Sequence, residues 1–164
     1  MSNELLAVVD ERDRIIDHRP RGEIHALSLP HRAVHILVFN DGGQLLLQKR
    51  SLKKDLNKGL WDTSAAGHVD QGEDYATCAP RELEEELGVS AALTALFKLE
   101  PSPDSGMEFI QVYECRHNGP FVFAVDEIDE ICWSARDEVN QRVDEDDATL
   151  TKTFKIIWRH YRAF

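Results

Sequence analysis

The segment Gly67–Val89 constrains the fold of this chain more than any other part of the sequence. It overlaps an extended-looking stretch, Leu60–Gly67, and its residue pattern from Tyr75 to Leu87 predicts a helix. Gly88 stands where a glycine that caps the C-terminus of a helix is expected. Gly67 permits a close approach or an unusual backbone turn after the strand. The segment therefore predicts a strand, a loop and a helix in that order.

Three glutamates of this helix, Glu82, Glu85 and Glu86, are spaced so that they share one face. A helix turns about 100° per residue, so positions i, i+3 and i+4 lie together while Leu83 and Leu87 point elsewhere. Like charges at these spacings cost a few tenths of a kcal/mol per pair. A divalent cation would remove this penalty. Carboxylate oxygens favour Mg²⁺, with Mn²⁺ as an alternative, so we expect a metal site here.

An ordinary solvated acidic helix is the alternative interpretation, since the chain has 30 acidic residues. Acidic composition explains neither Gly67 nor Gly88, however. Glu73 is also placed so that it can reach Arg81 and fasten the loop to the helix. These placements favour a functional motif over a solvated surface.

Pro80 limits where this helix can begin, because proline lacks an N–H and clashes with the carbonyl four residues earlier. Thr77 as N-cap would place Pro80 in the first turn, where proline is tolerated. Asp74 as N-cap would require a kink instead. Both alternatives leave Glu82 to Glu86 helical.

The length of 164 residues and a hydrophobic content of 42% predict one compact domain over residues 1–164. The sequence has no long apolar run, and its acidic start does not resemble a signal peptide, so we expect a cytoplasmic protein without membrane contact. A net charge of −11 disfavours a nucleic-acid polymer as partner. A small anionic molecule remains open if the site has its own cations, and so does a homodimer.

The pattern of the rest of the chain predicts mainly strands. Residues 1–30 should hold a hairpin of Leu5–Val9 and Ile15–Ile16, followed by a polar connection to Pro30. A second hairpin, about the turn Asn40–Gly43, should join Ala33–Phe39 to Gln44–Gln48. Further strands are expected near Ala92–Leu99, Met107–Cys115 and Ile128–Ser134, and an amphipathic helix over Asp147–His160.

Basic side chains gather just before the glutamate segment, at Lys49, Arg50, Lys53, Lys54 and Lys58. In so acidic a chain this concentration looks like a grip for phosphate, although a solvated basic loop explains the three later lysines nearly as well. Arg50 is the stronger candidate, because it closes a strand and could direct a bidentate guanidinium at a phosphate. Lys49 is its expected neighbour in that role.

Gly67, Glu73, Arg81–Gly88 and Val89 together resemble the catalytic signature of the Nudix hydrolase superfamily, the Nudix box. The preceding stretch HRAVHILVFNDGGQLLLQKRSLKKDLNKGLWDTSAAGHV is similar to the region that Nudix hydrolases share with type 1 isopentenyl-diphosphate isomerases. The resemblance implies an α/β fold, an α/β/α sandwich with a mixed sheet. The whole chain would then be one Nudix domain, with its box at residues 67–89.

The same resemblance implies a Mg²⁺-dependent hydrolase that cleaves the diphosphate linkage of a nucleoside-diphosphate compound or a related small pyrophosphate. Glu82, Glu85, Glu86 and Gly67 would hold the metal. Glu127 would add a carboxylate from a loop before a strand that contains tryptophan. Either Glu82 or Glu127 would take the proton of the attacking water, and the sequence leaves that choice open.

Two alternatives follow from the resemblance: an isomerase-like enzyme and a non-catalytic domain that binds a nucleotide. Isomerases use a cysteine where this chain has Ala66, and their paired glutamates on a later strand reduce here to Glu108. His31 and His68 match positions where isomerases hold a metal, and His25 lies nearby in sequence. A second ion is therefore open, with a phosphate contact as the other role for His68.

Overall fold

The computed structural model of the chain describes residues 4–164 and begins with a small two-stranded sheet. Strands β1 (Leu5–Val9) and β2 (Ile15–Pro20) pair antiparallel, which confirms the expected hairpin but extends its second strand. Residues 1–3 of the expected N-terminal segment lie outside the described residues. The polar connection that we expected next is wrong in part, because Arg21–Leu27 forms helix α1. The fully buried Ile24 of α1 packs against Leu6 and Val8, which holds the helix on β1.

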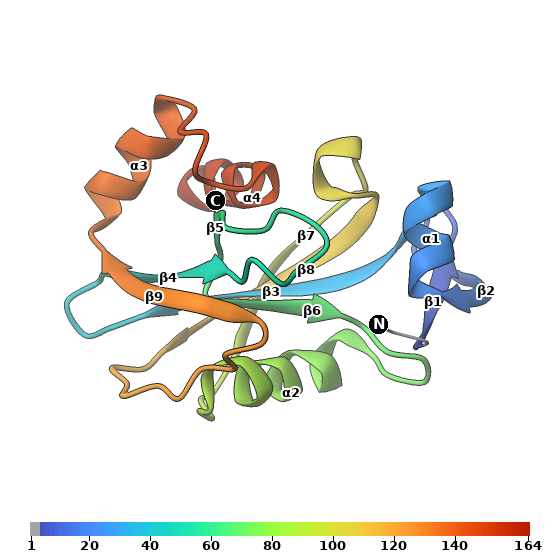
Figure 1. The fold of residues 1–164 in the computed structure, drawn as a ribbon, viewed down its shortest axis with the longest axis horizontal. Helices are drawn as coiled ribbons and strands as arrows, with labels where there is room; N and C mark the ends of the chain where they lie inside the picture. Colours follow the sequence, from blue (N-terminus) through green and yellow to red (C-terminus); the bar gives the residue numbers. More distant parts are fainter. Residues whose placement is uncertain (1–3) are drawn as a thin grey trace.

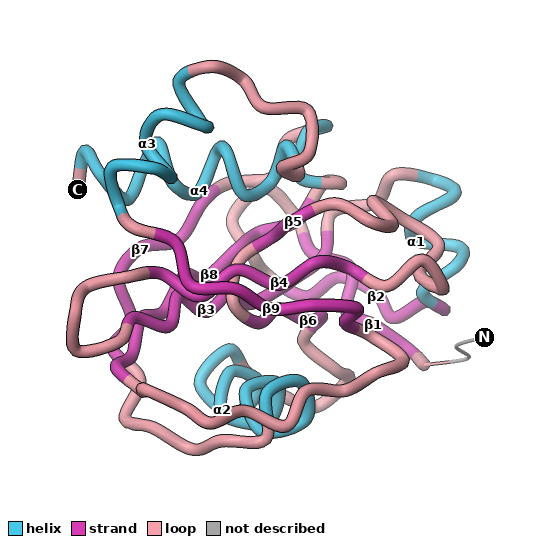
Figure 2. Tube along the Cα trace, turned by 60° about the vertical axis from the view of Figure 1, so that its left-hand side comes forward, coloured by secondary structure: helices cyan, strands magenta, loops and turns pink. Residues whose placement is uncertain are grey.

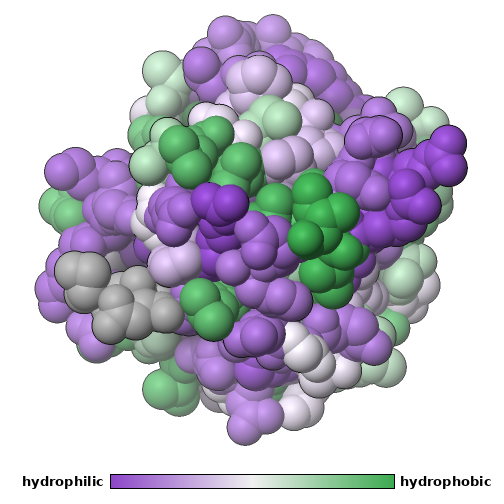
Figure 3. Space-filling model, turned by 90° about the vertical axis from the view of Figure 1, so that its right-hand side faces the viewer, coloured by the Kyte–Doolittle hydropathy of each residue, from purple (hydrophilic) through white to green (hydrophobic). Residues whose placement is uncertain are grey.

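Hydrophilic residues cover most of the face that carries α1 and this small sheet, and apolar residues form separate patches on it (Figure 3). Ile15, Ile16 and Leu27 are among the exposed apolar side chains. Single apolar residues are normal on a protein surface and do not by themselves mark a partner. The homodimer therefore stays a prediction.

The central sheet is mixed and is built around β3 (His31–Phe39). β3 pairs parallel with β8 (Glu108–Arg116) along its full length, from His31 opposite Glu108 to Phe39 opposite Arg116. All other pairings in this sheet are antiparallel among the described residues. Its remaining strands are β4 (Leu45–Arg50), β5 (Trp61–Asp62), β6 (Ala65–His68), β7 (Thr94–Leu99) and β9 (Ile128–Ser134). Figure 1 shows these strands between helices on both sides.

The other edge of β3 changes its partner along the strand. Its first half pairs with β6, whereas near its end only Phe39 and Leu45 link it to β4. The second predicted hairpin is thus correct at its turn, but its two strands diverge. The hydroxyl of Ser64 fills the gap, because it accepts a hydrogen bond from the N–H of Val38 and donates one to the carbonyl of Leu46. The helix Tyr75–Leu87 (α2) meets the sheet at this opening, where the carboxylate of Glu86 accepts hydrogen bonds from Gln48 of β4 and Ala66 of β6.

Alternating side chains of β3 serve two cores, as the period of a strand requires. Val34, Ile36 and Val38 face helix α2 (Tyr75–Leu87), while Leu37 and Phe39 face helix α4 (Lys152–Ala163). Helix α3 (Arg136–Asp144), which we did not expect, adds Val139 and Val143 to the second core. The predicted C-terminal helix exists but begins and ends later than Asp147–His160. Figures 1 and 2 show α2 on one side of the sheet and α3 and α4 on the other, so the α/β/α sandwich is confirmed.

The N-cap of helix α2 is Asp74 and not Thr77. The carboxylate of Asp74 accepts a hydrogen bond from the N–H of Thr77, and Pro80 therefore lies inside the helix. Gly88 caps the C-terminus in the left-handed conformation, with φ of 70°, as predicted. The exposed position of Pro80 keeps its ring away from the core. Glu82 to Glu86 are helical, as both alternatives required.

A short 3-10 turn, η1 (Pro103–Ser105), connects β7 to β8. Within residues 4–164, none of the helices has the length and apolar character needed to span a membrane.

Candidate active site

Gly67 of β6 lies directly against the carboxylate of Glu82 in α2. A Cβ atom added to Gly67 would lie 2.1 Å from Cδ of Glu82 and 2.3 Å from its Oε1. No side chain other than hydrogen fits there without a shift of the backbone or of the carboxylate. Gly67 lies within β6, so the close approach that the sequence allowed is present and the unusual turn is not.

Glu86 lies at the free edge of β6, where two donors from distant parts of the chain meet its carboxylate. The N–H of Ala66 donates to Oε1 at 2.9 Å, and the side-chain amide of Gln48 donates to the same oxygen at 3.0 Å. Gln48 also donates to the carbonyl of Ser64, which links β4 to the residues just before β6. Sheet and helix together therefore fix the position of this carboxylate.

Burial shapes the chemistry of the two inner glutamates. Removal from water raises the pKa of Glu82 to about 8, with the charge of Glu86 as a further cause. Burial likewise raises the pKa of Glu86 to about 7, although the donors from Ala66 and Gln48 favour its charged form. A bound cation would stabilise the charged form of these two adjacent carboxyl groups, which ionise less readily than ordinary glutamates.

Arg81 connects the remaining charged residues of the box. Its guanidinium donates to both carboxylate oxygens of Glu73, with Nε at 2.7 Å and Nη2 at 2.9 Å, which is the loop-to-helix fastening that the sequence suggested. Nη1 donates to Glu82 at 3.0 Å and to Glu85 at 3.1 Å. Glu85 is the outermost of the three glutamates, with 58% of its side chain exposed. Its carboxylate is thus open to solvent on the same helix face.

Glu127 precedes β9 and reaches the same region from outside the box. Its carboxylate accepts a hydrogen bond from the ammonium of Lys54, and both charges act on the pKa of Glu86. Glu127 is half exposed. The structure therefore brings the expected outer carboxylate, together with a lysine, close enough to Glu86 to act on its pKa.

Arg50 and Lys49, the two residues of β4 predicted to contact phosphate, have different surroundings in the structure. Arg50 donates from Nε to the carbonyl of Leu56, and its Nη1 lies 4.0 Å from Oδ2 of Asp62. Lys49 follows Gln48 in the strand, so its side chain leaves the sheet on the face opposite Glu86. Arg50 organises the loop after β4 in this structure, and a phosphate contact by either residue stays a prediction.

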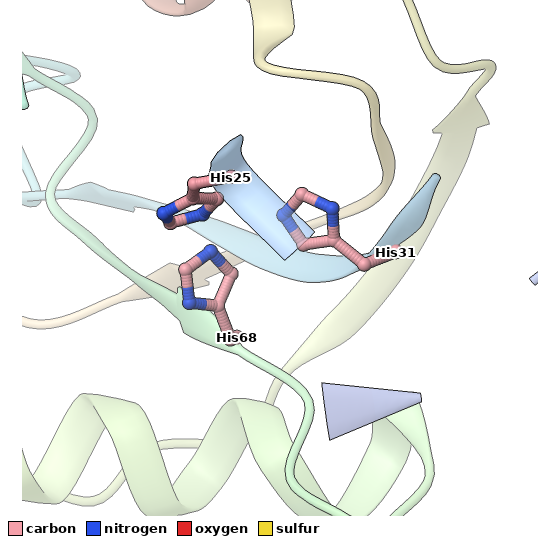
Figure 4. A group of neighbouring side chains, drawn as sticks. All are labelled: His25, His31 and His68. Carbon is pink, nitrogen blue, oxygen red and sulfur yellow. The ribbon is translucent and has the colours of Figure 1, made fainter. Parts of the chain in front are cut away.

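A second group of ligand-type side chains lies on the other face of β6. His25 of α1, His31 of β3 and His68 of β6 place one ring nitrogen each within 4.8 Å of the others. Figure 4 shows the three rings pointing toward one another, with α2 beyond the strand. Burial, with the charge of His68 as a second cause, lowers the pKa of His25 to about 4. At neutral pH its imidazole is uncharged and can offer a lone pair.

Glu108 at the start of β8 completes this group. Its Oε2 lies 3.0 Å from Nε2 of His68 and 3.5 Å from Nε2 of His31. Burial raises its pKa, but the two imidazoles beside it outweigh that effect and hold it well below the usual range. In the structure, His68 is hydrogen-bonded to this carboxylate. The contact of His68 with phosphate stays a prediction.

The tautomer of His31 follows from its neighbours. Nδ1 lies 2.8 Å from the carbonyl of Leu29, which can only accept, so this nitrogen carries the proton. Nε2 is buried and has no hydrogen-bond partner among residues 4–164. In neutral imidazole this nitrogen holds the lone pair that a metal needs, and it points into the cluster.

The comparisons with known proteins show the family to which this chain belongs. The family model of the NUDIX domain matches residues 29–154. The chain belongs to the Nudix family. A Nudix hydrolase of unknown activity from Yersinia pestis is 34% identical over 87% of this chain and 79% of its own length. The isopentenyl-diphosphate Delta-isomerase of Serratia proteamaculans is 41% identical over 56% of this chain and 51% of its own length. The crystal structure of the Deinococcus radiodurans protein DR0079 superposes with a TM-score of 0.84 at 27% identity and covers 96% of this Nudix chain and 98% of its own.

The interpretation of the sequence did not identify several residues of the site. Gln48 read only as part of a strand, and Lys54 as one of several loop lysines. Ala66 contributes through its backbone N–H, which the side chain does not reveal. The pattern of Arg21–Leu27, with apolar residues three apart at Ile24 and Leu27, was the available signal for α1 and thus for His25.

Proposed function

We propose that this Nudix family member is a Mg²⁺-dependent hydrolase that cleaves the diphosphate linkage of a nucleoside-diphosphate compound or a related small pyrophosphate. The observation that carries the proposal is the buried pair Glu82 and Glu86, held against β6 with raised pKa values. The exposed carboxylate of Glu85 and the outer carboxylate of Glu127 complete the set. A cytoplasmic location and one domain over residues 1–164 stay predictions alongside it.

The donor set suits a hard divalent cation. Glu82, Glu85 and Glu86 supply carboxylate oxygens, and Gly67 leaves room at the backbone for the carboxylate of Glu82. Mg²⁺ is the first choice because it prefers such oxygens and is commonly shared with phosphates, and Mn²⁺ is the alternative. A bound ion would lower the pKa of a water molecule and neutralise negative charge on the phosphates.

The residues of the chain would orient the substrate and accept a proton. Glu82 or Glu127 takes the proton of the water that attacks phosphorus, and the two differ in their surroundings. The carboxylate of Glu82 lies against Gly67 and accepts a hydrogen bond from Arg81. Glu127 is half exposed and paired with Lys54. Replacing each by glutamine would separate the roles, since loss of the base removes the corresponding limb of the pH profile.

We also propose a second metal centre at His25, His31 and His68, with Glu108 beside it. The free lone pair of His31 Nε2 and the convergence of the three rings support it. Imidazoles with one carboxylate suit Zn²⁺, Fe²⁺ or Mn²⁺ better than Mg²⁺. Metal analysis of purified protein tests this centre without any substrate. The expected result is about one transition-metal ion per chain, lost in His31→Asn and kept in the exposed His18→Asn control; equal metal content in both variants would reject the centre.

Isomerisation of an isoprenoid diphosphate is the main rival activity, because the Serratia relative is named as such an isomerase. Ala66 opposes it, since this position lacks the thiol that the isomerases use. A nucleotide-binding domain without catalysis is the other rival. The complete set of box carboxylates opposes that alternative.

One assay distinguishes the three. Purified protein with Mg²⁺ is incubated with nucleoside di- and triphosphates, nucleotide sugars, dinucleotides and isopentenyl diphosphate, and released phosphate or pyrophosphate, isomerised product and nucleotide binding are each measured. We expect cleavage of at least one diphosphate compound and no isomerised product. Tight nucleotide binding without any turnover would reject the hydrolase, and an isomerised product would favour the rival.

A further inference from the structure

Lys54, in the loop after β4, is a cationic side chain that contacts Glu127 and acts on the box carboxylate of Glu86. Its ammonium donates to the carboxylate of Glu127, and only 22% of its side chain is exposed. The neighbouring Lys53 differs sharply. Its side chain is 73% exposed and lies 3.4 Å from Asp126, which is itself 86% exposed. These two adjacent lysines form a natural comparison, because one is packed into the site and the other is on the surface.

Backbone contacts hold Lys54 at this place. The N–H of Ser51 donates to the carbonyl of Glu127 at 3.0 Å, and the N–H of Lys54 donates to the carbonyl of Ser51 at 3.1 Å. The N–H of Leu52 donates to the carboxylate of Asp129 at 3.2 Å. The turn that carries Lys54 is therefore attached to the segment that carries Glu127. The ion pair is part of a fixed arrangement and not a contact between two free side chains.

The same lysine lies close enough to act on Glu86. The charge of Lys54 lowers the pKa of Glu86, while the charge of Glu127 raises it. Lys54 thus partly compensates the negative charge of both the inner and the outer carboxylate. A divalent cation at these carboxylates would meet the ammonium both as a like charge and as a competitor for oxygen.

We propose that Lys54 is the resident counter-ion of Glu127 and that a divalent cation must displace it from this carboxylate in order to bind. The proposal rests on the metal-binding role given to these carboxylates above. Lys54 then sets the metal affinity of the free protein, since each binding event breaks its ion pair. Its removal would favour the metal, which is the opposite of what loss of an ordinary structural residue does.

Calorimetric titration with Mg²⁺ in the absence of substrate tests this. Mg²⁺ is preferred to Mn²⁺ because it avoids the histidine cluster. Lys54→Met removes the charge and keeps most of the stem, and it should tighten Mg²⁺ binding by roughly threefold, the size of one half-exposed ion pair. Lys53→Met is the matched control and should leave the dissociation constant unchanged. Lys54→Arg keeps the charge and should bind Mg²⁺ like the wild type.

A double-mutant cycle with Glu127→Gln locates the effect, because the gain from Lys54→Met should disappear in that background. Unchanged or weaker Mg²⁺ binding by a folded Lys54→Met variant would overturn the proposal for Lys54 without affecting the proposed hydrolase activity. Absence of Mg²⁺ binding by the wild type would instead overturn the proposed metal site, and the role of Lys54 with it. Circular dichroism of each variant shows whether it is folded.

Discussion

Gly67 and Glu82 are in such close contact that a methyl group on Gly67 would overlap the carboxyl carbon of Glu82, at 2.1 Å. Strand β6 and helix α2 meet at this pair, and Gly67 lies opposite Val34 of β3 in an antiparallel pairing. The absence of a side chain on Gly67 therefore leaves the space that the carboxylate of Glu82 occupies.

Gly67→Ala should displace the carboxylate of Glu82 and weaken Mg²⁺ binding and turnover by at least about tenfold, because the added methyl group would occupy the space of that carboxylate. Gly22→Ala is the matched control, since an added Cβ there meets nothing within 4 Å. Mg²⁺ titration and steady-state kinetics measure both variants. Wild-type metal affinity in Gly67→Ala would show that the contact does not position Glu82.

The raised pKa values of Glu82 and Glu86 predict how stability depends on pH without metal. Their ordinary value is 4.5, and in the folded chain they rise to about 8 and about 7. Between these limits the folded state binds more protons than the unfolded state, so the free energy of unfolding falls as pH rises. Thermal unfolding in chelator should therefore show a falling midpoint from about pH 6.5 to about pH 8, above the range in which the lowered pKa values of His25 and His35 act in the opposite direction.

Saturating Mg²⁺ should reverse this fall at the upper end of the range, because an ion that binds only the folded state adds about 2.7 kcal/mol at a hundredfold excess over its dissociation constant. Glu82→Gln removes one of the two titrating groups and should flatten the dependence on pH. A midpoint that rises with pH in chelator would contradict the assignment.

Asp13 joins the N-terminal hairpin to the rest of the molecule. Its carboxylate accepts hydrogen bonds from Arg32 at 2.7 Å, Lys98 at 2.7 Å and Tyr75 at 2.8 Å. Asp13→Asn keeps a residue that tolerates the positive φ of 61° but removes the charge. We expect a loss of about 1–3 kcal/mol in the free energy of unfolding. Denaturant unfolding measures it, with the exposed Asp17→Asn as control.

The dependence on pH identifies the cause of that loss. Burial raises the pKa of Asp13, but the hydrogen bonds from Lys98, Arg32 and Tyr75 outweigh it and lower the pKa below 3.8. The stabilisation is therefore complete above that value and is lost as pH falls through the lowered pKa. The difference between wild type and Asp13→Asn should be constant at neutral pH and shrink in acid. A difference independent of pH would exclude the charge as its source.

The sequence predicted best those elements whose determinants are local. Gly88 ends α2 as expected, and the strand Ile128–Ser134 has the predicted bounds. Helix α1 was missed because Pro20 and Gly22 read as a connection, whereas its stability comes from packing Ile24 against the small N-terminal sheet. The start of α2 was open for a similar reason, since the cap at Asp74 overrides the local preference of Pro80.

The site was predictable only where side chains within one helix make it. The shared face of Glu82, Glu85 and Glu86 follows from helical periodicity alone. The donors to Glu86 come from positions 20 and 38 residues away, and no spacing rule connects them. The histidine cluster likewise needs α1, β3 and β6 to meet, which only the tertiary structure supplies.

The most direct test of the central claim is the rate of diphosphate cleavage by the wild type and by Glu86→Gln, with and without Mg²⁺. It uses the best compound found in the substrate panel and a folded variant verified by circular dichroism. Our account predicts that removing Mg²⁺ and replacing Glu86 each lower kcat/KM by at least about a hundredfold, with no further loss when combined. Turnover that is equal in all four conditions would contradict it.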